Sequence, residues 1–254
     1  MQVFRYSFLM RNLIVRDFKI RYRNMSLGIF WSLLNPLVMM GVLTFIFTKI
    51  FPNPFTRNFG VFVLCGLVPY NFFAVAWVSG TTSLLNNASL VKRVRLPREV
   101  VPVSVVLANG IHFLIQIALL LAFVLGAGYG LNRNWLWLPF IFGLEVVFVC
   151  GLSLASSAMD VFFRDVRYVV ESINTVLFWL VPIFYSFAII PEQYKAVYQF
   201  NPVAAVVMAC RLVLLENRQP PISLLWKLAF VSTLAVVLGW LIFRRSKQRF
   251  ADYL

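Results

Sequence analysis

Few residues of this chain have the types and spacing that catalysis requires. The 254 residues include one histidine, His112, together with three cysteines and nine acidic residues. No G-x-x-x-x-G-K-[ST] phosphate-binding loop, H-E-x-x-H zinc motif or G-x-S-x-G nucleophile motif occurs. The three cysteines lie in separate apolar stretches without metal-ligand spacing, so we interpret them as small buried hydrophobes. We therefore expect no catalytic site and no metal site, and the remaining chemistry is that of binding surfaces.

One such surface is predicted around residue 90. The stretch 86–98 reads NNASLVKRVRLPR and mixes basic residues with apolar ones. Asn or Ser can cap a short helix there, and Pro97 ends it. A charge cluster that only oriented the chain in a membrane would not need the apolar residues. The mixture favours a short helix that docks in the groove of another protein.

A second surface is predicted at the N-terminus. On a helix, polar and basic residues there fall within one narrow wedge, and apolar residues occupy most of the remaining surface; the wedge contains Arg5, Asn12, Arg16, Lys19 and Arg23. This pattern predicts an amphipathic helix within 1–30 that lies in the membrane interface. Anchoring on anionic lipid and docking to a cytoplasmic partner are both compatible with it.

The elements that must position these surfaces are membrane spans. Apolar residues make up 61% of the chain and charged residues 13%, which excludes a soluble domain and a disordered chain. The formal charge of +14 is divided by long apolar runs, which argues against a nucleic-acid groove. About 20 helical residues cross a bilayer, and six runs qualify: about 31–51, 60–84, 101–128, 135–158, 168–190 and 223–243. The expected fold is an all-α membrane protein with six transmembrane helices in a single transmembrane domain, 1–254.

The segment 191–216 requires a separate interpretation. Its apolar part, 203–215, is too short to cross a membrane and contains Arg211. We expect a re-entrant or interfacial segment, which leaves six spans and both termini on one side. Sixteen of the 23 Lys and Arg residues then lie on that side, which the positive-inside rule identifies as cytoplasmic.

Two residues within the spans have further expected roles. Glu145 lies in the fourth run, so it should face protein or water or be protonated, and an inter-helix hydrogen bond is its simplest role. Pro182 interrupts the fifth run, where we expect a kink.

The ordered motifs of the chain resemble a known family. They are RDxKxRYR at 16–23, LGxxW at 27–31, NPL at 35–37, KRxxLPRE at 92–99, FRDV at 163–166, PIFY at 182–185 and NP at 201–202. Together they resemble type-2 ABC permeases that export polysaccharides such as O-antigen, teichoic acid and capsule. The resemblance covers nearly the whole chain in order, although no single motif is specific.

The resemblance implies the partners and the location of the protein. Two copies of the chain would form a channel in the inner membrane of a bacterium, with both termini in the cytoplasm. Two copies of a separate cytoplasmic ABC ATPase would bind ATP and Mg, and the cargo would be a lipid-linked glycan. The chain would contact membrane lipids and no nucleic acid, and it would have no cofactor and no ATPase activity of its own.

The resemblance also implies site residues. Segment 191–216 would gate the outer side of the channel. The loop 86–98 would be the coupling helix, which transmits movement from the ATPase. Coupling to the ATPase is assigned to Leu90, Val91, Lys92, Arg93, Val94, Arg95, Pro97, Arg16, Lys19 and Arg23. Aromatic faces can stack on sugar rings, so the substrate path is assigned to rings on two spans: Tyr70, Phe72, Phe73, Trp77, Phe178, Trp179, Phe184 and Tyr185. The alternatives are an ABC exporter of a small molecule or lipid, and a membrane scaffold that transports nothing.

Overall fold

The fold is entirely helical over the residues that the structure describes. The structure is a computed structural model and describes residues 2–23, 28, 30–51, 58–93 and 97–253, with the side chains of 2–7, 21, 93, 251 and 252 excluded. The elements along the chain are α1 (Gln2–Tyr22), α2 (Phe30–Phe45), η1 (Ile46–Ile50), α3 (Phe59–Thr81), α4 (Ser83–Asn86), α5 (Ala88–Arg93), α6 (Val100–Gly126), η2 (Arg133–Trp137), α7 (Leu138–Asp160), α8 (Val166–Leu180), η3 (Phe187–Ile189), α9 (Glu192–Phe200), α10 (Pro202–Leu214), α11 (Ile222–Ser246), η4 (Lys247–Arg249) and α12 (Phe250–Tyr253).

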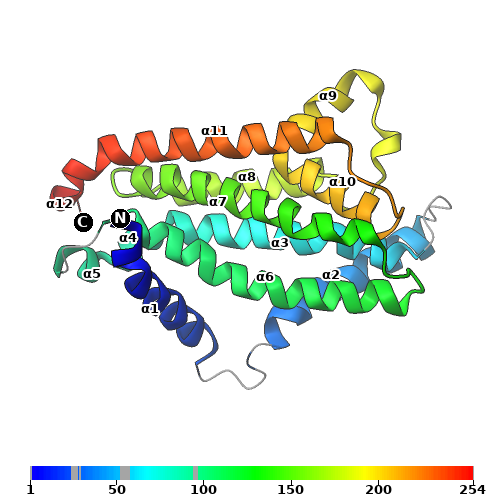
Figure 1. The fold of residues 1–254 in the computed structure, drawn as a ribbon, viewed down its shortest axis with the longest axis horizontal. Coiled ribbons are helices and arrows are strands. Elements are labelled where there is room, and N and C mark those ends of the chain that lie inside the picture. Colours follow the sequence, from blue (N-terminus) through cyan, green and yellow to red (C-terminus); the bar gives the residue numbers. More distant parts are fainter. Residues whose placement is uncertain (1, 24–27, 29, 52–57, 94–96, 254) are drawn as a thin grey trace.

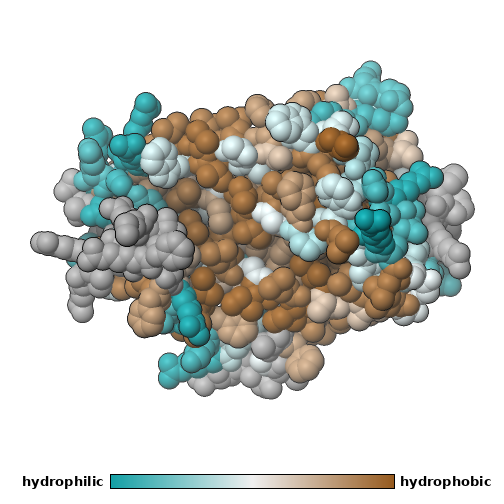
Figure 2. All heavy atoms as spheres, viewed as in Figure 1, coloured by the Kyte–Doolittle hydropathy of each residue, from teal (hydrophilic) through white to brown (hydrophobic). Residues whose placement is uncertain are grey.

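The helices form an elongated bundle with two distinct ends (Figure 1). One end carries α4, α5, α12 and both chain termini, and we call it the terminal end. The opposite end, which we call the far end, carries α9 and the connection from α6 to α7. Hydrophobic residues cover the middle of the molecule and hydrophilic ones gather towards both ends (Figure 2). This is the surface expected of a protein whose middle lies in a bilayer.

Five helical segments are long and apolar enough to cross a membrane. They are Phe30–Ile50, Phe59–Thr81, Val100–Gly126, Arg133–Asp160 and Ile222–Arg249. They coincide with five of the six predicted runs, which confirms the prediction of an all-α membrane protein. In the segment Phe59–Thr81, which is α3, 78% of the 18 residues that form its apolar stretch are buried. In the segment Phe30–Ile50, which begins with α2, the corresponding share is 11%. Thus α3 is the central helix of the bundle, and α2 is its least covered span.

Glycine allows α7 and α11 to approach closely. A Cβ atom added to Gly239 would lie 2.1 Å from the carbonyl oxygen of Gly151, and one added to Gly151 would lie 2.5 Å from the backbone of Ala235. No side chain could occupy either position without separating the two helices. Small residues at such crossings let backbones pack directly in a membrane, where the hydrophobic effect contributes little to association.

The predicted fifth run, 168–190, is not one helix. Helix α8 has 15 residues and ends at Leu180, and Val181 adopts an extended conformation with ψ of 136°. Fifteen residues span about 22 Å, which is shorter than the hydrocarbon core. The residue before a proline avoids the helical region, so Pro182 terminates the helix where we had expected only a kink. The chain continues towards the far end as a non-helical segment, 181–186.

Two short helices occupy the segment predicted to be re-entrant. Helices α9 and α10 meet at an angle of 99°. The side chain of Asn201, between them, accepts hydrogen bonds from the backbone N–H groups of Val203 and Ala204 at the start of α10. This N-cap, together with Pro202 at the first helical position, fixes where α10 begins. Helix α10 is almost wholly buried, whereas α9 has no buried residue.

Candidate functional site

The predicted coupling loop folds as two short helices directly after α3. Ser83 in α4 donates its hydroxyl to the Gly80 carbonyl at 2.6 Å, and Asn87 donates its side-chain amide to the Ser83 carbonyl at 2.9 Å. These side-chain bonds add to the backbone hydrogen bonds that the same two carbonyls accept from the N–H groups of Thr82 and Asn87. The loop therefore has a defined shape at the terminal end.

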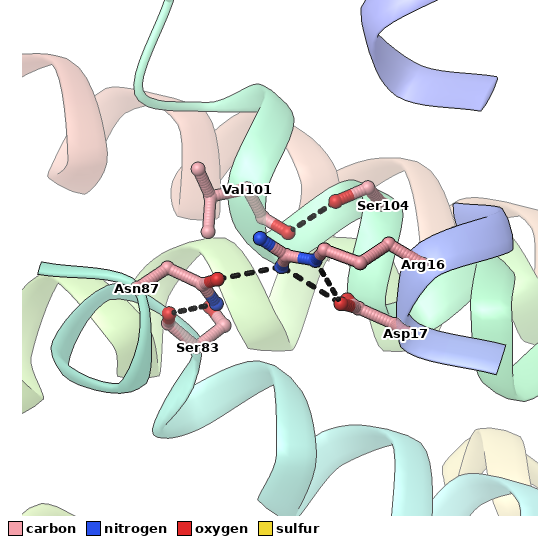
Figure 3. A network of polar contacts seen from close by, with 6 residues as sticks. All are labelled: Arg16, Asp17, Ser83, Asn87, Val101 and Ser104. Atoms are coloured by element: carbon pink, nitrogen blue, oxygen red, sulfur yellow. Dashed lines mark hydrogen bonds and ion pairs between the residues drawn. The ribbon is translucent and has the colours of Figure 1, made fainter. Parts of the chain in front are cut away.

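Helix α1 is tied to this loop through Arg16 (Figure 3). The Arg16 guanidinium donates to the Asp17 carboxylate at 2.9 and 2.7 Å and to the Asn87 side-chain carbonyl at 2.6 Å. The charged donor makes these bonds stronger than neutral ones. Two segments that the sequence analysis assigned separately to coupling thus meet in one contact. A cavity of about 570 Å³ lies beside them, between α1 and the end of α3.

The loop residues divide between the surface and the interior. Lys92 is exposed and Leu90 is half-buried, so both remain available to a partner. Val91 is 6% exposed and packs in a small apolar cluster of the chain itself, with Leu84 and Phe243. The groove that receives Val91 is therefore the chain's own, and this side chain can affect a partner only through the position of the loop. Val94 and Arg95 lie outside the described residues, as does the side chain of Arg93.

The remaining predicted coupling residues surround this loop. Lys19 on α1 and Arg23 directly after it are exposed, and with Arg16 they line a cavity of about 870 Å³ beside the start of α2. Pro97 is half-buried just before α6. The C-terminal segment also contacts this region, which the sequence did not predict. Arg98 donates to the Lys247 carbonyl, and the Lys247 ammonium lies 2.8 Å from a Glu99 carboxylate oxygen.

Helix α8 presents three different faces. Its core face packs on the bundle through Val170, Asn174 and Leu177. A second, apolar face is exposed and consists of Val169, Ile173, Val176 and Leu180. The third face combines polar and aromatic side chains that are exposed or half-buried: Arg167, Tyr168, Glu171, Ser172, Thr175, Phe178 and Trp179. An exposed polar face on a helix at membrane depth indicates contact with water, with a partner chain or with a polar substrate.

The eight predicted path aromatics fall into two groups. Tyr70, Phe72, Phe73 and Trp77 of α3 are all buried inside the chain. Phe72 stacks on Phe113 with a centroid distance of 4.4 Å, and the Tyr70 hydroxyl donates to the carbonyl of Asn174 in α8. Contact with a substrate would require these four rings to become exposed. Their positions suit rings that pack the centre of the bundle.

The second group surrounds the end of α8 and is accessible. Trp179 is 62% exposed and contacts Phe184 edge to face at a centroid distance of 5.4 Å. Phe178, Phe184 and Tyr185 are half-buried. The Tyr185 hydroxyl donates to the Leu180 carbonyl at 2.6 Å and lies 3.3 Å from the Tyr198 hydroxyl of α9. These rings therefore join the end of α8 to the far-end helices.

Arg211 secures the non-helical segment that follows α8, a role that sequence analysis missed. Its guanidinium is buried and donates to the carbonyls of Pro182 and Ile183, both at 2.5 Å, and to that of Tyr185 at 3.3 Å. It also donates to the Phe62 carbonyl of α3 and lies 3.5 Å from the centroid of the Phe62 ring. Carbonyls of the non-helical segment thus receive donors from α10. An arginine in an apolar stretch of 13 residues was the signal that could have revealed this role.

Two other expectations concern polar groups in the bundle. Glu145 faces protein, with 1% of its surface exposed, as one of the expected alternatives required. The inter-helix hydrogen bond expected for it is absent, because neither carboxyl oxygen has a partner among the described residues. Among the residues that the structure describes, no group of three or more His, Cys, Asp or Glu side chains could hold a metal ion.

Comparison with known proteins places these features in a family. The model of the family described as ABC-2 type transporter matches residues 9–215. The chain is 32% identical over 242 residues to the O-antigen export system permease protein RfbA of Klebsiella pneumoniae, which covers 94% of this chain and 92% of the relative. It is 29% identical to the protein of the same name from Myxococcus xanthus, covering 99% and 97% of the two chains. It is 23% identical to the polysialic acid transport protein KpsM of Escherichia coli, covering 93% and 92%. Because the family model spans most of the sequence and the relatives align along nearly all of it, the chain belongs to the ABC-2 type transporter family.

Proposed function

We propose that this chain is the membrane subunit of an ATP-driven exporter that moves a lipid-linked polysaccharide across the inner membrane of a bacterium. Two copies form the channel with two copies of a cytoplasmic ABC ATPase, which binds ATP and Mg. The names of the relatives support polysaccharide export. The observation that carries the proposal is the exposed polar and aromatic face of α8, which gives a bundle of apolar spans a surface suited to a hydroxyl-rich polymer.

The conduit is assigned to this face of α8 and to the rings at its end. Hydroxyl groups of Ser172 and Thr175 share the face with Tyr168 and Trp179. Such a surface can hold a sugar polymer weakly at many positions, so that the polymer slides instead of binding at one site. Burial of this face against lipid alone would leave the Glu171 carboxylate without compensation, because no described cation pairs with it.

The terminal end is assigned to the cytoplasm and to the ATPase. Sixteen of the 23 Lys and Arg residues belong to α1 and the segments at this end, in agreement with the positive-inside rule. The contact between Arg16 and Asn87 lets a movement of the loop reach α1. Reporter fusions after residues 132 and 218 should report the outer side, and fusions after 92 and 250 the cytoplasmic side. A cytoplasmic signal at 218 together with an outer signal at 250 would contradict this orientation.

Deletion of the gene in its native bacterium tests the function. Export predicts loss of the surface polysaccharide with accumulation of the lipid-linked polymer inside the cell, and recovery of both on complementation. The purified chain should hydrolyse no ATP alone, and the ATPase should co-purify with it. Unchanged surface polysaccharide after deletion would refute the proposal.

A further inference from the structure

A small polar cavity lies inside the bundle, between α2, α3 and α6. Its volume is about 170 Å³, and six of its lining residues carry hydroxyl, amide or imidazole groups: Ser32, Asn35, Asn71, Asn109, His112 and Gln116. We call it the amide notch. None of the described residues that line it carries a carboxylate, an ammonium or a guanidinium group. Polar side chains are costly at membrane depth, and those that face a cavity commonly mark a binding site or a pathway.

The walls of the amide notch are held in place by hydrogen bonds. Asn109, His112 and Gln116 lie three and four residues apart on α6, so they share one face of the helix. The Gln116 amide donates to the Ser32 carbonyl of α2 at 2.9 Å, and a nitrogen of the His112 ring lies 2.6 Å from the Tyr22 hydroxyl of α1. The notch is therefore a built feature in which α6 is bonded to both α2 and α1.

Two buried atoms in the notch lack a hydrogen-bond partner among the described residues. They are the side-chain nitrogen of Asn71, a donor, and the side-chain oxygen of Asn109, an acceptor. Asn109 is 4% exposed, and its amide nitrogen already donates to the Val105 carbonyl at 2.8 Å. Buried polar atoms without partners are costly, so the notch should take a group that both accepts and donates. A hydroxyl group does both, whereas a carboxylate only accepts and an ammonium only donates.

The notch opens on one particular strip of α3. Asn71 and Val75 are one turn apart on that strip. On one side of it the Tyr70 hydroxyl contacts α8, and on the other side Phe72 stacks on a ring of α6. Trp31 and Val75, both 46% exposed, form the rim. No residue of α8 lines the notch; the link to that helix, whose polar face is assigned to the conduit, runs through Tyr70, the neighbour of Asn71 in α3.

We propose that the amide notch is a subsite for one uncharged, hydroxyl-bearing sugar ring of the passing polysaccharide, and this inference rests on the proposed function. A volume of 170 Å³ holds about five water molecules, which is comparable with a single sugar ring. The Asn71 and Asn109 amides bind its hydroxyl groups, and Trp31 covers an apolar ring face at the rim. The lining favours neutral rings over rings that carry a carboxylate, because it has no cation to compensate the charge.

A binding experiment on the assembled exporter tests the subsite. The exporter is placed in lipid nanodiscs free of sugar-based detergent and titrated with a neutral galactose oligomer and with a galacturonic acid oligomer of equal length. We expect the neutral oligomer to bind more tightly, and Asn71→Leu combined with Asn109→Leu to weaken it about tenfold through two lost hydrogen bonds. Failure of the neutral oligomer to bind, equal binding of the acidic one, or unchanged binding by the double variant would each overturn the proposal.

A second variant with a matched control guards against misfolding of the double variant. Trp31→Leu removes only the rim ring and should weaken binding of the neutral oligomer several-fold. Trp240→Leu on α11 changes a ring of similar exposure, 43%, outside the notch and should leave binding unchanged. Equal effects of the two changes would contradict the assigned role of Trp31.

Surface polysaccharide in cells separates the two proposals. If deletion of the gene abolishes it while the notch variants export and bind as the unmodified chain does, the notch holds water only and the proposed function stands. If deletion leaves surface polysaccharide unchanged, the proposed function itself fails.

Discussion

Replacement of Arg211 by methionine should release the segment that follows α8. The change keeps an unbranched apolar stem and removes the guanidinium that binds the carbonyls of Pro182, Ile183 and Tyr185. Hydrogen bonds to a charged donor contribute about 1.5–3 kcal/mol each in water-soluble proteins. Bonds between membrane helices average about 0.6 kcal/mol and reach about 1.7. The two bonds at 2.5 Å therefore set an expected loss of about 2–4 kcal/mol for Arg211→Met, with the ring contact to Phe62 included.

Thermal unfolding of the purified protein and limited proteolysis of segment 181–201 measure this loss. Arg211→Met should lower the unfolding temperature and expose the segment to cleavage. Arg211→Lys should recover part of the stability, because an ammonium retains the charge but cannot reach several carbonyls with one planar fork. Arg218→Met is the control, since that side chain is 76% exposed at the same end of the molecule. Equal stability and equal cleavage of Arg211→Met and the unmodified chain would refute the role assigned to Arg211.

Three further changes probe other parts of the molecule. Gly239→Ala places a methyl group against a facing backbone carbonyl and should destabilise the protein by about 1–3 kcal/mol or prevent its assembly, whereas Gly143→Ala meets nothing within 4 Å and should be neutral in the same unfolding assay. Asn87→Leu removes the acceptor for Arg16 and should reduce export several-fold at normal protein level, measured as surface polysaccharide; unchanged export would argue against coupling through this contact. Trp179→Leu combined with Tyr185→Leu should reduce export while ATPase binding remains normal, because stacking platforms lose about 1–3 kcal/mol per ring; full export would place these rings against lipid.

The long spans were predictable because their length and hydropathy are local properties of the sequence. One span prediction failed for a local reason, the proline that ends α8, whereas the roles that the sequence did not reveal depend on contacts between distant residues. The end of α8 at Leu180 follows from Pro182, but the stability of the segment beyond it depends on Arg211, about 30 positions later. A lone arginine in an apolar stretch does not reveal which carbonyls it binds.

In the candidate site, too, some features were visible in the sequence and others depend on contacts that only the fold reveals. A short amphipathic helix predicts that Val91 is covered, and only the fold shows that the cover is the chain's own core. Aromatic type likewise could not separate the buried rings of α3 from exposed Trp179, because lipid, protein and sugar can all cover an aromatic ring. The basic wedge of α1 was visible in the sequence, whereas its contact with Asn87 joins positions 71 residues apart.

The packing of the C-terminal segment against Arg98 and Glu99 at the terminal end has a consequence for the order of biosynthesis. Phe250 is fully buried against Phe243 and Phe162, and the Arg98 guanidinium lies 5.8 Å from the centroid of its ring. The carbonyl of Lys247 that Arg98 binds is translated 149 positions after Arg98 itself. The surface at the terminal end therefore reaches its final form only after the last span has been inserted. A nascent chain that stalls before Phe250 presents an incomplete surface, so a partner that recognises the finished shape selects chains in which α11 and α12 are already in place.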